Sequence, residues 1–356
     1  MASPYGPLGR GGIDRVADLI CDSIQRSPDL GIQIVRLSTR GRGWIGWSPL
    51  FLARSLLNLY LAGATRRIDA LHVHLASRGS TYRKLILTAL ARSLRIPYIV
   101  HLHGAYFDRF WRQAGPTLSH AIEHFFEESS AIIVLGSYWE NVITSRLPHL
   151  QHRIVVLPNA TPSRRTERRL STGRQARITF LGAIGPRKGA FDLLKVLGNL
   201  TDLTNWSATV AGDGEVAESL AFATQLGIAD RVTVPGWLGP EAVTNLLKQT
   251  DIFVLPSYGE NLPVVLIEAF SHGISCIATP VGSVPEVIEN GRNGLLTPPG
   301  DLNALEQALR LLITDAALRR TLGTAARRTH AERYEMGYYI KQLATIWRQV
   351  AHEVDL

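Results

Sequence analysis

The chain has 356 residues, of which 46% are hydrophobic and 19% charged, and its formal net charge at pH 7 is +8. This composition excludes an intrinsically disordered protein and is ordinary for a globular α/β chain, and the length suggests two domains. Only two cysteines occur, Cys21 and Cys276, one in each half, which excludes a disulfide framework and fits a reducing compartment.

The N-terminal segment predicts a glycine-rich turn between a strand and a helix. Residues 5–12 (YGPLGRGG) follow only four residues, MASP, and precede a helical pattern over 12–27. Gly11 and Gly12 allow backbone amides to approach a phosphate at a helix N-terminus, although a purely structural turn explains them equally well. A full buried strand is expected before such a turn, so either the first strand is short or the chain starts further upstream. The segment lacks the apolar core of a signal peptide.

Short apolar runs alternate with amphipathic segments in both halves of the chain. Buried strands are predicted at 32–38, 69–75, 97–104, 130–136 and 153–158 in the first half, and at 177–183, 206–214, 231–237, 251–257 and 275–281 in the second. Further helices are expected over 80–95 and 116–128, and three more after Asp301, the last over about 337–350. This alternation predicts a parallel, doubly wound sheet in each half.

The apolar segment from Trp44 to Gly63 contains polar residues and is a poor membrane-spanning helix. We expect an amphipathic or interfacial helix instead. Trp44 and Trp47, with Arg40 and Arg42 just upstream, suit a membrane interface, where Trp side chains lie at headgroup depth. Packing in the core of the domain is the alternative, because the fold needs a helix here.

Basic residues gather at the start of the helix that follows the second predicted strand. Arg78, Arg83 and Lys84 lie in the run SRGSTYRK (77–84). They form either a solvated helix start or a cradle for the diphosphate of a lipid-linked acceptor.

Histidines alternate along two of the predicted strands. His101 and His103 share one face of the strand at 97–104, and His103 lies at the carboxyl end, where α/β sheets present ligands. His-x-His on a strand can bind zinc, but no cysteine or carboxylate cluster completes such a site, so no metal is expected. His72 and His74 repeat the spacing and are interpreted, like His101, as structural.

A polar, Arg-rich segment at 161–177 predicts an interdomain linker. The net charge is +8 over residues 1–160, +5 over 161–177 and −5 over 178–356. A basic first half suggests an anionic partner, either nucleic acid or a membrane surface with a phosphorylated lipid. The basic residues form no recognisable nucleic-acid module, so nucleic acid is not expected.

The run GAIGPRKG (182–189) joins a predicted strand to a predicted helix. Arg187 and Lys188 at this strand end suit two phosphates, Arg as a bidentate donor and Lys as a point charge. A solvated basic pair is the alternative. Because cations are unfavourable at a helix N-terminus, an anion is expected beside them.

Two carboxylates in the segment 251–294 are separated by seven intervening residues. Glu260 falls in a loop, because Pro263 suits the first helical position, and Glu268 falls on the helix that follows. Their separation is at most about 12 Å along a helix, and amides at the helix start favour an anion between them. Hydroxyl acceptors on both sides of a phosphate site suit a nucleotide diphospho-sugar.

With this spacing, and with the run TPVGSVPEVIENGRNGLLTPPGD (279–301), the sequence resembles the donor site of family 4 retaining glycosyltransferases, and the resemblance covers nearly the whole chain. It implies the GT-B architecture: two Rossmann-like, doubly wound α/β domains facing across a cleft, with a C-terminal helix that crosses back to the first domain. The implied domains are 1–160 with a returning helix at about 337–356 for the acceptor, the linker 161–177, and 178–336 for the donor.

The resemblance also assigns roles to residues. Donor-binding positions are Gly11, Gly12, Arg187, Lys188, Glu260, Asn261, Leu262, Pro263 and Glu268; catalytic positions are His103, Glu260, Arg187 and Lys188; and acceptor-binding positions are Arg78, Arg83 and Lys84. His103 matches a histidine that contacts the donor sugar. One departure is Ala183, where the family often has an arginine.

The sequence therefore predicts a retaining glycosyltransferase that moves a hexose from a UDP- or GDP-sugar to a glycan acceptor, polyprenyl-diphosphate-linked or free, in bacterial exopolysaccharide, capsule or lipopolysaccharide synthesis. No metal or other cofactor is expected. The predicted location is cytoplasmic, peripheral on the inner face of an anionic membrane. A sugar-nucleotide 2-epimerase of the same architecture and a non-catalytic sugar-nucleotide or lipid-headgroup binder are the alternatives.

Overall fold

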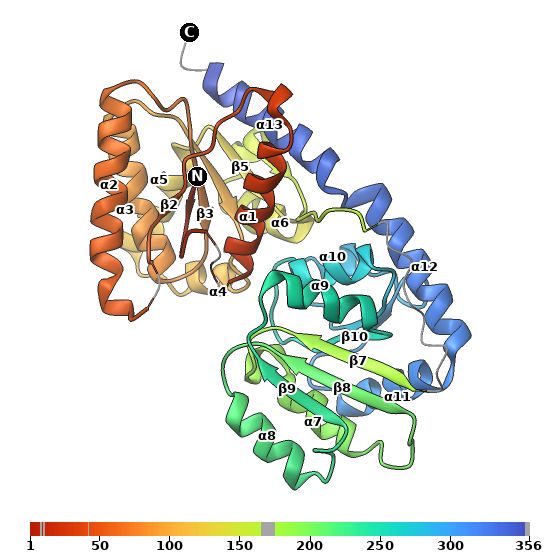
Figure 1. Cartoon of the computed structure of the whole chain (residues 1–356). Coiled ribbons are helices and arrows are strands. Elements are labelled where there is room, and N and C mark those ends of the chain that lie inside the picture. The colour runs from red at the N-terminus through yellow and green to blue at the C-terminus, as the bar shows by residue number, and fades with distance from the viewer. Residues whose placement is uncertain (8, 10, 42, 165–174, 353–356) are drawn as a thin grey trace. The chain divides into compact units, whose positions relative to one another are not determined.

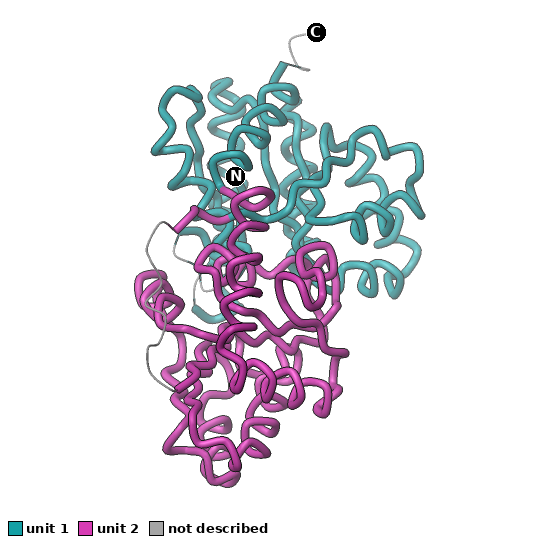
Figure 2. The backbone as a smooth tube through the Cα atoms, turned by 90° about the vertical axis from the view of Figure 1, so that its right-hand side faces the viewer, with its two compact units in different colours: residues 1–160, 336–356 teal, residues 161–335 magenta. Residues whose placement is uncertain are grey.

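The computed structural model describes residues 1–7, 9, 11–41, 43–164 and 175–352. The chain divides into two compact units (Figure 2). Unit 1 comprises Met1–Ala160 and Met336–Leu356, and unit 2 comprises Thr161–Glu335. Most of the predicted linker, residues 165–174, lies outside the described residues.

Unit 1 is built on a parallel six-stranded sheet in the order β2-β1-β3-β4-β5-β6. Its strands are β1 (Ala2–Ser3), β2 (Leu37–Ser38), β3 (Leu71–Leu75), β4 (Tyr98–Leu102), β5 (Ala131–Val134) and β6 (Ile154–Val156). All residues of β3, β4 and β5 are buried, as expected for parallel strands covered on both faces.

Helices cover this sheet (Figure 1). They are α1 (Gly12–Gln25), α2 (Ser48–Ala64), α3 (Gly79–Ser93), α4 (Phe107–Arg112), α5 (Pro116–Glu127), α6 (Ser137–Thr144) and α13 (Met336–His352), with 3-10 turns η1 (Pro28–Leu30), η2 (Ile45–Trp47) and η3 (Pro148–Arg153). Although α13 follows unit 2 in the chain, it packs against α1, and Trp347 on α13 donates a hydrogen bond to His72 on β3.

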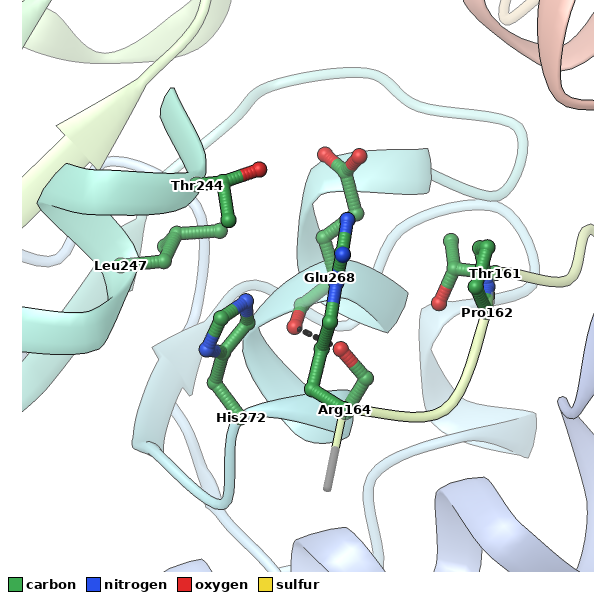
Figure 3. A pocket seen from close by; sticks show the side chains of 8 residues that line it. Thr161, Pro162, Arg164, Thr244, Leu247, Glu268 and His272 are labelled. Atoms are coloured by element: carbon green, nitrogen blue, oxygen red, sulfur yellow. Dashed lines mark hydrogen bonds between the residues drawn. The ribbon is translucent and has the colours of Figure 1, made fainter. Parts of the chain in front are cut away.

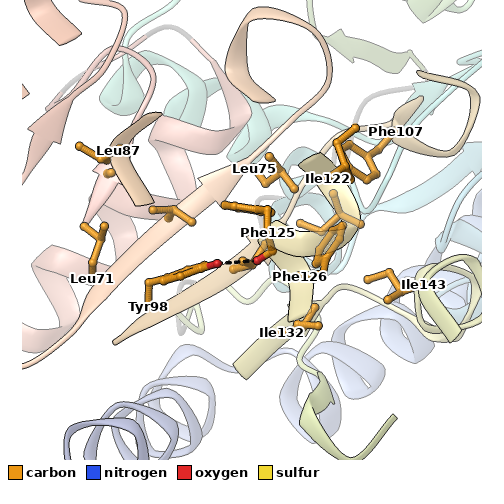
Figure 4. Packing of buried hydrophobic residues seen from close by; sticks show 14 of the residues in the cluster. Leu71, Leu75, Leu87, Tyr98, Phe107, Ile122, Phe125, Phe126, Ile132 and Ile143 are labelled. Carbon is orange, nitrogen blue, oxygen red and sulfur yellow. Dashed lines mark hydrogen bonds between the residues drawn. The ribbon is translucent and has the colours of Figure 1, made fainter. Parts of the chain in front are cut away.

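Aromatic side chains of α5 fill the core of unit 1 (Figure 4). The helix starts at Pro116, whose fixed φ suits the first turn. It buries Phe125, whose ring stacks on Tyr98 of β4, and Phe126, whose ring contacts Phe107 and Trp111 of α4. The Tyr98 hydroxyl on β4 donates to the Phe125 carbonyl at 2.6 Å. Burying each of these rings contributes about 1.5–3 kcal/mol of transfer free energy. This packing holds the central strands of the sheet, and therefore their carboxyl ends, in place.

The predicted buried strand at 32–38 is wrong in extent. Only Leu37 and Ser38 pair with a neighbour, because β1 offers just Ala2 and Ser3 as ladder partners. Residues 31–36 have no regular structure, and Val35 is 64% exposed. The apolar run was correct as a signal of a strand, but its length was limited by the partner strand.

Unit 2 contains a second parallel six-stranded sheet, in the order β12-β11-β10-β7-β8-β9. Its strands are β7 (Ala176–Leu181), β8 (Trp206–Ala211), β9 (Val232–Gly236), β10 (Ile252–Leu255), β11 (Ser275–Ala278) and β12 (Leu295–Leu296). Its helices are α7 (Ala190–Gly198), α8 (Val216–Gln225), α9 (Pro240–Gln249), α10 (Val264–Ser271), α11 (Leu302–Thr314) and α12 (Ala316–Arg333), with η4 (Pro186–Lys188) and η5 (Val284–Glu286). The predicted fold class, two Rossmann-like α/β domains, is confirmed.

Each sheet has one place where the chain reverses its direction of growth. In unit 1 the chain runs from β1 to β2 on one side and returns to β3 on the other; in unit 2 it runs from β7 to β8 and β9 and returns to β10. Loops that leave the carboxyl ends of the strands on either side of such a point diverge, and ligands of open α/β sheets bind there. We call these places the unit 1 and unit 2 switch points.

Helix α2 has an unusually apolar outer surface. Trp44 and Trp47 just before it are 73% and 55% exposed, and Leu50, Leu57 and Leu61 on it are 54–60% exposed. The described residues contain no helix that is long and apolar enough to cross a membrane. The alternative that this segment packs into the core is therefore wrong for these side chains.

Candidate active site at the unit 2 switch point

The unit 2 switch point brings together the two sequence segments with the strongest signals. Strands β7 and β10 are direct neighbours, with Ile252 opposite Ile178. The loop 182–189 leaves β7 and the loop 256–263 leaves β10, so both start at the same edge of the sheet. A position at the carboxyl ends of parallel strands is where this fold presents ligands.

Lys188 and Glu260 form the centre of the site. The Lys188 ammonium lies 2.5 Å from Glu260 Oε1, and the Ser257 hydroxyl donates to the same oxygen at 2.7 Å. Glu260 is buried and Lys188 half-buried. An ion pair in this partly desolvated position is stronger than a surface pair, so the two side chains hold each other at the mouth of the loops.

Arg187 ties the two loops together. Its Nη1 donates to the Gly259 carbonyl at 2.9 Å, and the Tyr258 amide donates to the Arg187 carbonyl at 2.9 Å. The rest of the Arg187 side chain is exposed. A guanidinium has five N–H donors, so this contact leaves others for an anion in front of the loops.

Two glycines allow the loops to approach one another. At Gly189, φ is +69° and a Cβ would lie 2.2 Å from the Pro256 carbonyl oxygen; at Gly282, φ is +57° and a Cβ would lie 2.2 Å from the Glu260 carbonyl oxygen. Any other residue would have to move the backbone at both places. Gly282 thus places the loop that follows β11 directly against Glu260.

Asn261, Leu262 and Pro263 are buried and connect Glu260 to α10. The Asn261 carbonyl accepts a hydrogen bond from the Ser283 amide at 2.8 Å. Pro263 is the residue before the helix rather than its first residue, with ψ 120°. Apart from this shift of one position, the predicted strand, loop and helix are present.

Glu268 lies on α10, with 8% of its surface exposed, and lines a pocket of unit 2 (Figure 3). Thr244 and Leu247 of α9, Arg164 and His272 line the same pocket. The pKa of His272 is lowered to about 4 by burial and then by nearby cations, of which Arg164 is the first. His272 is therefore neutral at pH 7, and Glu268 is the acidic side chain of the pocket.

The histidines of unit 1 form hydrogen-bonded pairs. His74 Nδ1 lies 2.8 Å from His103 Nε2, and His72 Nε2 lies 3.1 Å from His101 Nδ1. Burial lowers the pKa of His103 to about 3 and holds the pKa of the other three well below its usual range. All four imidazoles are therefore neutral at pH 7.

The donors of this cluster disfavour a metal ion. Among the described residues, His72, His74 and His101 place ligand atoms within 4.8 Å of one another. Trp347 Nε1, which can only donate, bonds to His72 Nδ1 at 2.9 Å. In neutral His72 the proton is then on Nε2, which donates to His101, so His72 has no lone pair left for a cation. The histidine cluster fits two hydrogen-bonded pairs of neutral imidazoles.

In unit 1, Gly11 precedes α1 and Gly12 is its first residue. A Cβ at Gly12 would meet nothing within 4 Å, so packing does not require glycine there. The nearby loop is held by Asp14, whose Oδ1 accepts from the amides of Tyr5 and Gly6 at 3.1 Å each. Asp14 was not among the residues singled out from the sequence.

The three proposed acceptor residues differ in their surroundings. Arg78 is exposed, at the N-cap of α3, with φ +57°. Arg83 is half-buried, with Nη1 above the first turn of α3 near Gly79. Lys84 is fully buried, and its ammonium donates to Thr39 Oγ1 at 2.8 Å. The structure therefore brings Lys84 to the interior end of this basic group rather than to its surface.

Sequence reasoning missed Ser257 and Arg40 as well as Asp14. Ser257 lies three residues before Glu260 in the loop that follows β10, a place where a hydroxyl is a signal for a polar site. Arg40 lies in the loop after β2 and was considered only as a membrane contact. Its guanidinium stacks 4.7 Å from the centre of the Tyr5 ring.

Two protein families match adjoining parts of the chain. Residues 164–329 match the glycosyl transferases group 1, and residues 17–165 match glycosyltransferase family 4. The first match contains the whole unit 2 switch point, and the second contains the proposed acceptor residues of unit 1.

Similar proteins and structures agree with these matches. The chain is 26% identical to an α-D-kanosaminyltransferase of Streptomyces kanamyceticus, over 86% of this chain and 83% of that protein. It is 24% identical, over 74% and 71%, to an Escherichia coli enzyme named as a UDP-Gal:α-D-GlcNAc-diphosphoundecaprenol α-1,3-galactosyltransferase. The structure of Anabaena HepE in complex with UDP and glucose is similar with a TM-score of 0.74, at 18% identity and 97% coverage of both chains.

Proposed function

The chain belongs to the group 1 glycosyltransferases of family 4, and from that premise we propose that it is a retaining enzyme that transfers a hexose from a UDP- or GDP-sugar to a glycan acceptor. It is an enzyme of the GT-B type. The acceptor that we propose is linked to a polyprenyl diphosphate, as in the assembly of bacterial exopolysaccharide, capsule or lipopolysaccharide.

The observation that supports the donor site best is the group formed by Lys188, Glu260 and Ser257 at the unit 2 switch point. A diphosphate in front of the two loops would meet the ammonium of Lys188 and the outward donors of Arg187. Lys188 already lies in a loop that Gly189 and Arg187 hold in place, so binding costs little reorganisation. HepE, which shares this fold, binds UDP.

Glu268 and Glu260 are proposed to bind the two ends of the donor. Glu268 accepts hydrogen bonds from the ribose hydroxyls, since it is the carboxylate of the pocket between α9 and α10. Glu260 accepts from a hydroxyl of the transferred sugar. Asn261, Leu262 and Pro263 fix the backbone between them, and the first amides of α10 favour the negative charge of the phosphates.

Catalysis in this proposal depends on stabilising the leaving group and needs no metal or cofactor. As the bond from the anomeric carbon to the diphosphate oxygen breaks, Arg187 and Lys188 stabilise the charge that develops on that oxygen. The acceptor hydroxyl attacks from the same face, and the departing diphosphate takes its proton, so the anomeric configuration is retained. His103, which His74 orients, contacts the transferred sugar.

The acceptor half of the proposal rests on unit 1. Arg78, Arg83 and Lys84 provide its positive charge. Gly11 and Gly12, at the start of α1, are proposed to bind the donor. The galactosyltransferase of Escherichia coli named above uses a diphosphoundecaprenol-linked acceptor.

We propose that the exposed apolar surface of α2 attaches the protein peripherally to the cytoplasmic face of an anionic membrane. Trp44, Trp47 and Leu50 would enter the interface, and Arg54, which is also exposed, would meet the headgroups. This attachment brings unit 1 to the surface where a polyprenyl-linked acceptor resides.

The experiment that tests the function is incubation of the purified chain with radiolabelled UDP- and GDP-sugars and a bacterial membrane lipid extract. We expect label in the lipid fraction with one of the two donors. An epimerised nucleotide sugar would establish the epimerase instead, and unchanged donor that nevertheless binds would establish a non-catalytic binder.

A further inference from the structure

Unit 1 contains a lysine that is buried without a carboxylate partner. Lys84 on α3 is 0% exposed, and among the described residues its ammonium donates a hydrogen bond to a hydroxyl oxygen, Thr39 Oγ1, at 2.8 Å. Thr39 Oγ1 in turn donates to the Ser3 carbonyl. Burying an ammonium whose hydrogen-bond acceptor is a neutral hydroxyl is costly, so a structural role does not account for the choice of lysine here.

Two arginines lie beside this lysine. Arg83 is its neighbour on α3, and Arg40 follows Thr39 in the chain. Arg83 and Arg40 are close enough for the charge of Arg40 to lower the pKa of Arg83, after the effect of burial. In both guanidinium groups the Nε atom is buried and has no hydrogen-bond partner among the described residues. Three cations from two segments of the chain thus lie close together, and the two arginines keep N–H donors that can bind a ligand.

The acidic side chain of this region is already engaged. Asp14 is 0% exposed, and its Oδ1 holds the amides of Tyr5 and Gly6 and lies 3.8 Å from Arg36. Burial raises the pKa of Asp14 to about 6, so even this carboxylate is destabilised in its charged form. Asp14 orders the loop after β1 and does not neutralise Arg40 and Arg83.

These groups lie where a ligand is expected in this fold. Tyr5 and Gly6 follow β1, Arg40 follows β2, and α3 follows β3, so all of them adjoin the unit 1 switch point. Arg40 is held over the Tyr5 ring and bonds to its hydroxyl, and Arg83 is folded back over the start of α3. The arginines are therefore positioned before any ligand arrives.

We propose that Arg40, Arg83 and Lys84 form an anion site at the unit 1 switch point that binds a phosphate or diphosphate ester. Resting on the proposed function, we identify that ester as the diphosphate of the acceptor. Arg40 and Arg83 contact its oxygens, and Lys84 supplies charge from beneath. Arg40 thereby belongs to the acceptor site rather than to the membrane contact alone.

The site is coupled to a proton. Burial, and then the charge of Arg83, lower the pKa of Lys84 to about 7, whereas Asp14 raises it. The titratable and charged groups that face Lys84 are thus Arg83, Asp14, His74 and the Met1 amino group. Lys84 helps to lower the pKa of His74 and of the Met1 amino group. An anion bound to the arginines favours the ammonium form, so binding takes up a proton near pH 7.5.

The test is titration of inorganic pyrophosphate into the full chain by calorimetry, with saturating UDP present so that the donor site is filled. Arg40→Gln and Arg83→Gln should each weaken pyrophosphate binding at least tenfold. Arg67→Gln, an equal charge change at an exposed position of the same unit, should change it less than twofold. Equal weakening in all three variants, or in none, would overturn the site.

A second titration isolates Lys84. Sulfate does not titrate between pH 6.5 and 8.5, so any proton that is taken up from the buffer when sulfate binds is bound by the protein. We expect uptake at pH 7.5 that is lost in Lys84→Met. If that variant does not fold, uptake by the wild-type chain still decides, since its absence would remove Lys84 from the site.

Two competitors identify the source of the anion. Farnesyl diphosphate should displace pyrophosphate from the wild-type chain, whereas phosphatidylglycerol vesicles should not. Displacement by the vesicles would assign the site to lipid headgroups and overturn the acceptor assignment. UDP binding, measured in the same samples, distinguishes the failure of the anion site from the failure of the proposed function. A chain that binds UDP and transfers sugar but does not bind pyrophosphate refutes the anion site alone. A chain that binds pyrophosphate but not UDP refutes the proposed function alone.

Discussion

The two switch points have the same arrangement of strands, but they differ in whether their lysine is paired with a carboxylate. In unit 2 the cation Lys188 is paired with Glu260, and Ser257 supports the pair. Among the described residues of unit 1, the buried Lys84 donates to a hydroxyl, and Arg40 and Arg83 each keep a buried Nε without an acceptor. The lysine of unit 2 thus has a carboxylate partner within the protein, and the lysine of unit 1 has a neutral one.

This difference shows how one fold supports two kinds of anion binding. A paired lysine can pass from its carboxylate to an incoming phosphate and back, which suits a substrate that is bound, cleaved and released. An unpaired cation cluster binds whichever anion fits and depends strongly on protonation.

Removing the lysine of the unit 2 switch point should have the largest effect. Lys188→Ala deletes the ammonium that stabilises the leaving diphosphate, so kcat/KM should fall about 10²- to 10³-fold. The measurement is steady-state transfer from the donor identified in the lipid-extract assay, in which a 10²- to 10³-fold fall corresponds to about 2.7–4 kcal/mol. Lys195→Ala, an exposed position on α7, is the control and should retain activity. Near-normal kcat/KM for Lys188→Ala would place the phosphate site elsewhere.

Lys84, the lysine of unit 1, should make the free energy of unfolding depend on pH. Its pKa is about 7 in the folded chain and about 10.5 in the unfolded chain. Between these values the unfolded chain binds more protons, so the free energy of unfolding should rise with pH, by up to about 1.4 kcal/mol per unit.

Urea unfolding at pH 7 and pH 9 measures this effect. The wild-type chain should gain about 2–3 kcal/mol relative to Lys84→Met over this interval, because the variant lacks the titrating group while other groups cancel in the comparison. If the free energy of unfolding changes equally with pH in the two proteins, burial does not lower the pKa of Lys84.

The two glutamates of unit 2 should separate nucleotide binding from transfer. Glu268→Ala should weaken UDP or GDP binding about tenfold, or about 1.4 kcal/mol, through loss of hydrogen bonds to the ribose. Glu260→Gln should bind the free nucleotide at least as well as the wild type, because Lys188 is no longer paired, and yet lose transfer. Calorimetry and the transfer assay report the two quantities. Equal loss of nucleotide affinity in both variants would reject the assignment.

The membrane contact should be the weakest of these effects. Replacing Trp44 and Trp47 by Ser should reduce binding to phosphatidylglycerol vesicles several-fold, and added salt should reduce the binding of the wild type as well. Donor binding at unit 2 should change much less with salt. Cosedimentation with vesicles at low and high salt is the measurement. If the protein does not bind such vesicles at low salt, the proposed membrane attachment is wrong.

Much of the fold follows from local patterns. Strands such as β4 and β10 are short apolar runs that end in polar or glycine-rich loops, and Glu260 and Glu268 are linked by one loop and one helix. Periodicity also indicates the burial of Lys84, since Thr81, Lys84 and Thr88 recur at helical spacing and all three are buried. The sequence interpretation treated Lys84 as a surface cation because its neighbours Arg78 and Arg83 are basic.

Other features depend on contacts between distant segments. The strand at 32–38 was overpredicted because its length is set by β1. Ser257 and Arg40 gain their roles from partners 3 and 35 residues away, Glu260 and Tyr5. The bond from Trp347 to His72 spans 275 residues, and no local pattern indicates it, although it decides that the histidine cluster disfavours a metal ion.

The most direct test of the account compares one anion at the two switch points. UDP should be titrated into the wild-type chain, Lys188→Ala and Arg83→Gln at pH 7.5. The account predicts that UDP affinity falls at least tenfold in Lys188→Ala and is unchanged in Arg83→Gln. Loss of UDP affinity in Arg83→Gln with normal affinity in Lys188→Ala would contradict it, because the nucleotide diphosphate would then bind at the unit 1 switch point.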